Sequence, residues 1–191
     1  MFKFLIKTFH KWYGWTVIGD FPTDIPKYVV IGGPHTTNWD FMKALFVIYD
    51  RNATITILGK KELFRPPFGW IFRALNVIPV ERKKNMNAVD ATVEIFKQHE
   101  KLVIGLSPEG TRSKTDRLRT GFYHIARKAN VPLVMIGVNY ANKSMEIKSP
   151  FLPSDDMEKD FEYIQKFYEQ QTGLYPEDSF WYKKAIETSK K

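Results

Sequence analysis

The chain has 191 residues, of which 43% are hydrophobic and 26% charged, the composition of an ordinary globular protein. It contains no cysteine, which excludes disulfides and thiolate metal sites, and its four histidines do not have the spacing of a zinc motif, so no metal is expected. The net charge is +8, with 13 basic and 6 acidic side chains in residues 1–84 against 8 and 10 in residues 136–191. A basic surface suits anionic lipids, phosphorylated substrates, acidic carrier proteins or nucleic acid, and solubility alone is the other explanation.

The first fifteen residues are rich in aromatic and basic side chains. In a helix, one side would carry Phe2, Leu5, Ile6, Phe9 and Tyr13, and the other side Lys3, Lys7 and Lys11. Such a helix suits an anionic membrane surface, for which residues 1–20 are the candidate segment; a helix packed on the core is an equal alternative. Without a signal-peptide cleavage site or a long apolar run, we expect a cytoplasmic protein, peripheral to the inner face of the cell membrane.

Beyond residue 27, short apolar runs alternate with segments of helical periodicity. The predicted order is strand 28–32, helix 38–49, strand 54–58, helix 61–74, strand 77–80, helix 86–98, strand 102–106, helix 121–128, strand 132–138 and helix 157–170. Pro66-Pro67 interrupts the helix at 61–74, and Ser154 or Asp155 is the expected cap of the last helix. The polar segment after Tyr175 is expected to be loosely held.

This alternation predicts an α/β fold with a mostly parallel central sheet flanked by helices. No repeat or linker interrupts the chain, so residues 1–191 are predicted to form a single domain with its motif-bearing core at about 28–138. In parallel sheets, ligands bind where strands end and loops begin. Both motifs described next follow apolar strands directly.

The first motif, His35-Thr-Thr-Asn-Trp-Asp40, follows the strand at 28–32. In a regular helix, His35 and Asp40 would lie about 140° apart and about 7.5 Å along the axis, so their side chains would meet poorly. Gly33-Pro34 favours a sharp turn that leaves His35 in a loop and Asp40 in the turn that follows. A carboxylate on one ring nitrogen then fixes the tautomer while the other nitrogen takes a proton from a hydroxyl nucleophile. A helix cap beside an ordinary loop histidine is the alternative.

The second motif, Ser107-Pro-Glu-Gly-Thr-Arg112, follows the strand at 102–106. Gly110 permits a close turn against a ligand, and Thr111 and Arg112 offer donors to a phosphate group. Glu109 could accept a hydrogen bond from a substrate hydroxyl or hold an arginine in place. An ordinary turn with a surface arginine is the alternative.

A cation at the end of the strand at 77–80 adds to this pattern. Arg82 is delivered beside Lys83 and Lys84, and arginines from separate strand ends can converge on one phosphate. For the two lysines, solvation at the surface is the preferred interpretation.

Together these motifs resemble the lysophospholipid acyltransferase family, which includes the 1-acylglycerol-3-phosphate acyltransferases. Its signatures are matched, in order, by Pro34 to Asp40, by the strand from Val77 that ends in Arg82, by Pro108 to Arg112, and by the strand Val131–Val134. Order and spacing agree over residues 28–138, which is far more specific than any one motif.

The resemblance implies a glycerol-3-phosphate acyltransferase-like fold. It also implies transfer of a fatty acyl group from acyl-CoA or acyl carrier protein to the hydroxyl of a lysophospholipid such as lysophosphatidic acid, without a cofactor or a covalent acyl-enzyme. His35 would be the general base, oriented by Asp40. The phosphorylated acceptor would be bound by Glu109, Gly110, Thr111, Arg112 and Arg82, with Lys60 a weaker candidate, and Val131–Val134 would shape the acyl pocket.

Two other functions fit parts of the pattern. Pro34 and Thr37 stand where many family members have asparagine and serine, so the acceptor could instead be an amino-acid lysolipid. Asn76 stands where glycine is usual, which affects the turn before the strand and not the role of Arg82. The basic surface could also belong to a non-enzymatic module that binds membrane or nucleic acid. No nucleic-acid-binding motif is present, so no nucleic-acid partner is expected.

Overall fold

The computed structural model describes residues 2–37, 39–67, 69–74, 76–80, 87–109 and 119–180. Its strands are β1 (Thr16–Ile18), β2 (Lys27–Gly33), β3 (Thr56–Lys60), β4 (Val77–Val80), β5 (Leu102–Leu106), β6 (Leu133–Asn139) and β7 (Ser144–Ile147). They form one sheet in the order β1-β7-β6-β2-β5-β3-β4. Neighbours are parallel except for β6 and β7, which are antiparallel, so the predicted mostly parallel sheet is confirmed.

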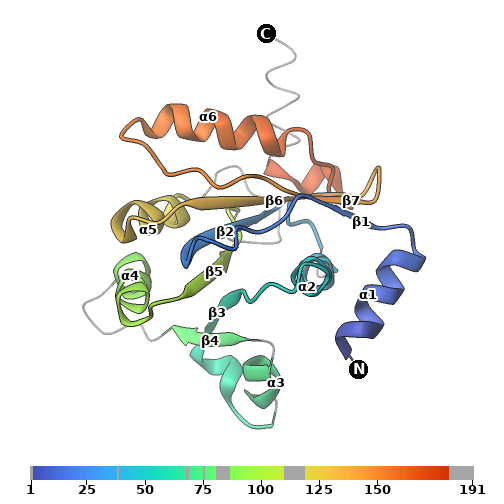
Figure 1. The fold of residues 1–191 in the computed structure, drawn as a ribbon, viewed down its shortest axis with the longest axis horizontal. Helices are drawn as coiled ribbons and strands as arrows, with labels where there is room; N and C mark the ends of the chain where they lie inside the picture. Colours follow the sequence, from blue (N-terminus) through green and yellow to red (C-terminus); the bar gives the residue numbers. More distant parts are fainter. Residues whose placement is uncertain are drawn as a thin grey trace.

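Helices cover both faces of this sheet. They are α1 (Phe2–Trp12), α2 (Asp40–Asp50), α3 (Gly69–Ala74), α4 (Ala88–Gln98), α5 (Gly121–Ala129) and α6 (Met157–Tyr168), with 3-10 turns at Lys61–Phe64 and Pro176–Asp178. Alternate strand residues face opposite sides: Ile31 and Leu133 pack with α4, α5 and α6, whereas Val30 and Val134 pack with α1 and α2. Figure 1 shows α6 along one side of the sheet and α1 and α2 on the other.

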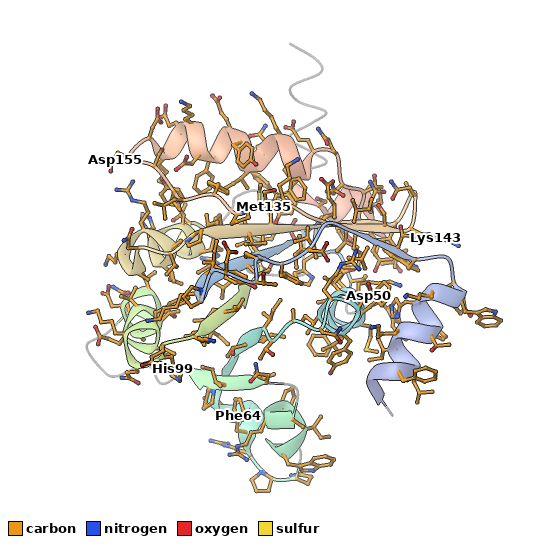
Figure 2. The ribbon with its side chains drawn as sticks, viewed as in Figure 1. Asp50, Phe64, His99, Met135, Lys143 and Asp155 are labelled. Carbon is orange, nitrogen blue, oxygen red and sulfur yellow. The ribbon has the colours of Figure 1, made fainter. Side chains whose placement is uncertain are left out.

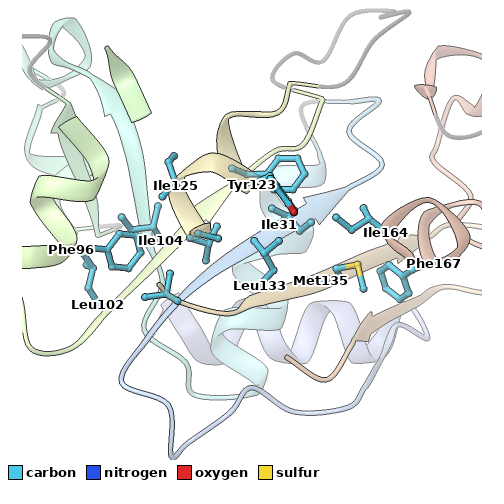
Figure 3. Close-up of a cluster of buried hydrophobic side chains, with 14 of the residues drawn as sticks. Ile31, Phe96, Leu102, Ile104, Tyr123, Ile125, Leu133, Met135, Ile164 and Phe167 are labelled. Atoms are coloured by element: carbon cyan, nitrogen blue, oxygen red, sulfur yellow. The ribbon is translucent and has the colours of Figure 1, made fainter. Parts of the chain in front are cut away.

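One of the two core clusters joins the central strands to the helices on one face. Ile31 of β2, Ile104 of β5 and Met135 of β6 lie in one buried group that extends to Ile164 and Phe167 of α6 (Figure 3). Next to them, the hydroxyl of the fully buried Tyr168 donates to the carbonyl of Ile31 at 2.6 Å. This bond, worth about 1 kcal/mol in a typical case, ties the end of α6 to the strand that leads into the first motif.

The N-terminal helix is both packed and exposed. Ile6 and His10 are buried against α2, where the ring of His10 stacks on Phe46 at 4.6 Å. Lys11 pairs with Asp50, the last residue of α2, at 3.5 Å, and Figure 2 shows Asp50 on the side of α2 that faces α1. Phe4, Phe9 and Trp12 of the same helix are exposed. The packed face agrees with the alternative of a helix packed on the core, and a membrane contact through the exposed face stays a prediction.

Several predicted boundaries differ from the structure. The short strands β1 and β7 were not predicted, and α2 begins at Asp40 rather than at residue 38. The helix predicted at 61–74 is a 3-10 turn followed, beyond the prolines, by the short α3, because proline lacks the N–H that a helix interior needs.

The C-terminal part of the chain is held more firmly than its sequence indicates. Asp156, not Ser154 or Asp155, caps α6 by accepting the N–H of Lys159 at 3.1 Å. Beyond Tyr175 the chain makes a 3-10 turn, and Ser179 is only 1% exposed. The expectation of a loose tail is therefore wrong as far as residue 180, and residues 181–191 lie outside the described part.

The sheet brings the first and second motifs to one edge. Ile31 of β2 is opposite Leu106 of β5, and Gly33 of β2 is opposite Gly137 of β6, all in parallel pairs. The segments that follow these strands therefore leave the sheet side by side at its carboxyl edge, where parallel α/β sheets bind ligands. They begin at Pro34, Ser107 and Tyr140.

Candidate active site

The turn predicted between His35 and Asp40 is present. His35 lies in the loop after β2, and Asp40 begins α2, so their side chains are not separated by a helical turn. Nδ1 of His35 lies 3.5 Å from Oδ2 of Asp40. This separation is at the long limit for a hydrogen bond, and such long contacts are common in catalytic pairs before a substrate binds.

The Asp40 carboxylate is buried and held on both oxygens. It is 1% exposed. Oδ2 accepts the backbone N–H groups of Thr36 and Thr37 at 2.8 and 2.9 Å. Oδ1 accepts the hydroxyl of Tyr140 at 2.7 Å. The carboxylate therefore holds the turn between His35 and Asp40 closed through the backbone of Thr36 and Thr37, and it has a fixed orientation toward His35.

These contacts decide the charge of Asp40. Burial alone would raise the pKa of Asp40, but the contact with His35 and the hydrogen bonds from Tyr140, Thr37 and Thr36 lower it by more, so the pKa lies below its ordinary value. Asp40 is therefore a permanent anion at neutral pH.

The imidazole of His35 has one buried and one accessible side. Nδ1 is buried and makes no hydrogen bond of good geometry among the described residues, and Oδ2 of Asp40 lies 3.5 Å from it. The side chain as a whole is 27% exposed, so the exposure belongs to the rest of the ring, which includes Nε2. An anion on one ring nitrogen and access to the other is the arrangement that a general base requires.

Glu109 joins the second motif to the first. Its Oε2 accepts the backbone N–H of His35 at 2.8 Å, although the two residues are 74 positions apart. The carboxylate is 2% exposed, and Oε1 makes no further hydrogen bond of good geometry among the described residues. Burial raises the pKa of Glu109 to about 7 against the opposing effect of the His35 N–H. In the described structure this side chain ties the two motifs together.

Tyr140 is a site residue that the sequence did not reveal. It follows β6, comes 100 positions after Asp40, and donates to it from the far side of the loop. Its ring meets Trp15 edge to face, with centroids 5.1 Å apart. The signal that could have found it is topological, since the strand predicted at 132–138 had to end at the same edge of the sheet as the first motif.

The chain after α6 packs behind the His35 loop. The N–H of Tyr175 donates to the hydroxyl of Thr36 at 3.3 Å. At Gly173 the contact is so close that a Cβ atom would lie 2.7 Å from Cγ2 of Thr36 and 3.4 Å from Cγ of Pro34. Only a glycine fits this position without displacing the loop.

Other predicted site residues lie outside the described part of the chain. Gly110, Thr111, Arg112 and Arg82 are among these residues, so their positions stay predictions. Lys60 is the last residue of β3, opposite the end of β4. Its backbone is described, but its side chain is not.

An apolar cavity lies beside the second motif. It has a volume of about 300 Å³, is walled by Val89, Leu106 and Phe122, and extends to Ser107 and Arg119. Leu106 is the last residue of β5 and Ser107 follows it, so the cavity reaches to within two residues of Glu109. A space of this composition accepts a hydrocarbon chain more readily than a polar group.

A larger apolar groove of about 660 Å³ lies between α1 and α2. Exposed aromatic residues line it: Phe4, Phe9 and Trp12 of α1, and Trp39, which precedes Asp40. Tyr140 and Lys43 form part of its wall, and the ammonium of Lys43 lies 3.8 Å from the centroid of the Trp15 ring. Tyr140 therefore lines the groove and also donates its hydroxyl to Asp40.

Within the described residues, no three acidic or histidine side chains are grouped closely enough to hold a metal ion. The helices in the same part of the chain are too short or too polar to cross a bilayer.

Comparisons with known sequences point in one direction. A family model described as "Acyltransferase" matches residues 20–139. A 1-acyl-sn-glycerol-3-phosphate acyltransferase from Cocos nucifera is 31% identical over 142 residues, a match that covers 64% of this chain and 45% of that protein. The chain therefore spans less than half the length of this relative.

The fold has a counterpart among solved structures. It is similar to the crystal structure of the 1-acyl-sn-glycerophosphate (LPA) acyltransferase PlsC from Thermotoga maritima, with a TM-score of 0.61 and 19% sequence identity. The match covers 99% of this chain and 80% of that one. At this identity the likeness concerns the fold, and it confirms the predicted α/β architecture.

Proposed function

The chain belongs to the acyltransferase family, as its motifs predicted, and from this we propose that it moves a fatty acyl group from an acyl thioester to the hydroxyl of a lysophospholipid such as lysophosphatidic acid. The donor is acyl-CoA or acyl carrier protein. The observation that carries the proposal is the His35 imidazole, which has Asp40 at its buried nitrogen and the rest of its ring accessible.

In this reaction His35 is the general base. Its Nε2 removes the proton from the acceptor hydroxyl while the hydroxyl oxygen attacks the thioester carbonyl carbon. The tetrahedral adduct then collapses, the C–S bond breaks, and the thiolate leaves and takes up the proton from the imidazolium. The products are an O-acyl ester and a free thiol, and no acyl-enzyme forms.

Asp40 supports this step electrostatically. Its fixed negative charge stabilises the imidazolium that forms during attack and holds the proton of neutral His35 on Nδ1, which leaves Nε2 free to accept. Glu109, bonded to the backbone of His35, holds the loop that carries the base. The proposal that Glu109 also contacts the acceptor is separate from this structural role.

The acceptor phosphate is assigned to the second motif and the neighbouring strand end. Gly110, Thr111 and Arg112 follow Glu109 directly, and Arg82 follows the end of β4 by two residues. The register of β3 and β4 puts Lys60 and Val80 opposite one another, which supports Lys60 as a further cation near this edge. Arginine is suited to the phosphate because its planar fork binds two oxygens at once.

The apolar cavity beside Ser107 is the proposed site of the acyl chain. It begins at the carboxyl end of β5, at the same edge of the sheet as His35, so a chain bound there would bring its thioester toward the base. Its walls are formed by β3, β5, α4 and α5. The strand Val131–Val134, proposed from the sequence to shape this pocket, does not line the cavity; Leu133 instead packs in the core behind it.

Thiol release tests the reaction. The purified chain, given acyl-CoA and lysophosphatidic acid, should release CoA thiol, detected with a chromogenic thiol reagent. Because the chain has no cysteine, the protein contributes no background to this signal. His35→Ala should reduce the release to the uncatalysed rate, since it removes the only proposed base.

The matched control is His124→Ala, an exposed histidine on α5. It should keep the wild-type rate. Undiminished thiol release by His35→Ala would refute the mechanism. Release that does not depend on lysophosphatidic acid, but does on another lysolipid, would replace the acceptor and keep the chemistry.

The exposed aromatic face of α1 is the proposed contact with an anionic membrane. Trp12 is 81% exposed, and Phe4 and Phe9 are exposed beside it around the groove that Tyr140 and Trp39 also line. Single exposed apolar residues are ordinary, but a contiguous aromatic group of this kind marks an interaction surface. The net charge of +8 adds attraction to anionic lipid.

Vesicle flotation checks this contact. Trp12→Ser should weaken binding to vesicles of phosphatidylglycerol and phosphatidylcholine about fivefold to tenfold, because an aromatic ring is lost from the bilayer interface. Trp70→Ser is the control, since Trp70 is also exposed, at 68%, but lies on α3. Equal losses for the two variants would contradict a specific role for α1.

A further inference from the structure

Tyr140 reaches the proposed base through Asp40. Its hydroxyl donates to Oδ1 of Asp40 at 2.7 Å, whereas Oδ2 of the same carboxylate takes the N–H groups of Thr36 and Thr37 and faces Nδ1 of His35. A carboxylate bonded on one oxygen can still swing about its Cβ–Cγ bond. Bonded on both, it keeps the same oxygen toward the imidazole.

Tyr140 is itself fixed from both sides. Its ring meets Trp15, which precedes β1, edge to face, with an interplanar angle of 85°. Its backbone N–H donates to the carbonyl of Thr172 at 2.8 Å, and the side-chain amide of Asn139 donates to the carbonyl of Gln170 at 3.0 Å. The hydroxyl is therefore presented to Asp40 by a rigid support rather than by a mobile side chain.

We propose that Tyr140 is a positioning residue for acyl transfer, whose hydroxyl keeps the Asp40 carboxylate aimed at His35. The inference rests on the proposed roles of His35 and Asp40 and adds a residue to them. Tyr140 lies just beyond residues 20–139, the part of the chain that matches the family model. It acts through Asp40 and has no contact with the reacting atoms in this assignment.

The charged groups around Asp40 and Tyr140 set the pH behaviour of this arrangement. Lys43, one turn further along α2, lies 5.8 Å from the centroid of the Tyr140 ring, and burial lowers the pKa of Lys43 to about 8 although Asp40 attracts its charge. Glu109 is joined to the backbone of His35 on the other side of the loop. The pKa of Tyr140 is raised by burial and by Asp40, so its hydroxyl keeps its proton, and remains a donor, throughout the working range.

The test is Tyr140→Phe, which removes the hydroxyl and keeps the ring against Trp15. We expect kcat to fall about tenfold, as for the loss of one hydrogen bond to a charged group, with KM unchanged. The acid limb of the pH–rate profile should also move to higher pH, because Asp40 with one donor fewer attracts the proton on the base more strongly.

Tyr123→Phe is the matched control. Tyr123 donates to a carboxylate oxygen of Asp160 at 2.9 Å, so it also makes a buried tyrosine–aspartate bond, but between α5 and α6. This variant should lose stability in thermal unfolding without any change in kcat or pH profile. A merely structural role for Tyr140 would give the same result in Tyr140→Phe.

The two proposals fail in different ways. If Tyr140→Phe keeps the wild-type kcat and pH profile while His35→Ala is inactive, the role of Tyr140 is wrong and the proposed reaction stands. If His35→Ala is active, the reaction mechanism itself is wrong. A rise in KM with unchanged kcat would place Tyr140 in substrate binding and would overturn the positioning role.

Discussion

Asp40 and Glu109 are two carboxylates that contact the same histidine, one at its ring and the other at its backbone N–H. Both are almost fully buried, but their pKa values are shifted in opposite directions. Asp40, 1% exposed, has three short hydrogen bonds and the contact with His35, and its pKa is lowered. Glu109, 2% exposed, accepts the His35 N–H at 2.8 Å; burial raises its pKa to about 7, against the lowering effects of the backbone N–H groups of His35 and Phe180. Hydrogen-bond donors to the carboxylate, rather than its depth of burial, therefore decide whether a buried acid stays ionised.

The two carboxylates also differ in function within the site. A permanently charged acid beside a base can stabilise a positive charge at every working pH, whereas an acid that titrates near neutrality cannot do so reliably. Asp40 is therefore the electrostatic partner of His35. Glu109 is a structural link between motifs whose charge state changes in the physiological range.

The largest difference between the two carboxylates is expected in the variant Asp40→Asn. Asparagine keeps nearly the same shape but removes the charge, so the imidazolium loses its stabilisation and the tautomer is no longer fixed. We expect kcat to fall about 10³-fold to 10⁴-fold, as in other histidine–aspartate pairs. Steady-state thiol release measures this, and a loss of less than tenfold would show that the fixed charge of Asp40 is not used.

A smaller effect on stability is expected from Glu109→Gln. The folded state holds the Glu109 proton up to about pH 7, whereas the unfolded chain releases it near the ordinary value of 4.5. Between these values the folded state binds more protons, so the wild-type free energy of unfolding falls as pH rises. Between pH 5 and pH 8 the variant should therefore gain about 2 to 3 kcal/mol relative to the wild type.

Urea unfolding at the two pH values measures this gain. Glu158→Gln, an exposed glutamate on α6, controls for the loss of a surface charge. Asp40 contributes with the opposite sign: because its pKa is lowered on folding, its contribution is complete above the ordinary value and is lost as pH falls through the folded pKa. A stability difference for Glu109→Gln that does not change with pH would contradict the assignment of a titrating acid at this position.

The alternation of the longer strands with helices, and the turn in the first motif, were predictable from local patterns. The apolar runs of β2, β5 and β6 predicted a parallel sheet, and the wide angular separation of residues five apart in a helix required a turn at Gly33-Pro34. The structure has that turn, with His35 in the loop and Asp40 at the start of α2.

Contacts between distant segments were not predictable in this way. Tyr140 looks like any aromatic residue at a strand end, and its bond to Asp40 spans 100 positions. The strands β1 and β7 have three and four residues, too few for a periodic pattern, and depend on pairing with each other and with β6. The packing of the tail behind the loop depends on Gly173, which in sequence indicates only a turn.

Gly173 has a consequence for how this protein can vary. Gly173 is 138 residues from His35 in the sequence and touches no proposed substrate group. Thr36 and Pro34 nevertheless occupy the space that a side chain at this position would need. In an alignment of relatives, the residues at 173 and 36 should therefore change together, with bulk gained at one only where it is lost at the other. Such covariation would mark the C-terminal tail as an inherited part of the catalytic apparatus.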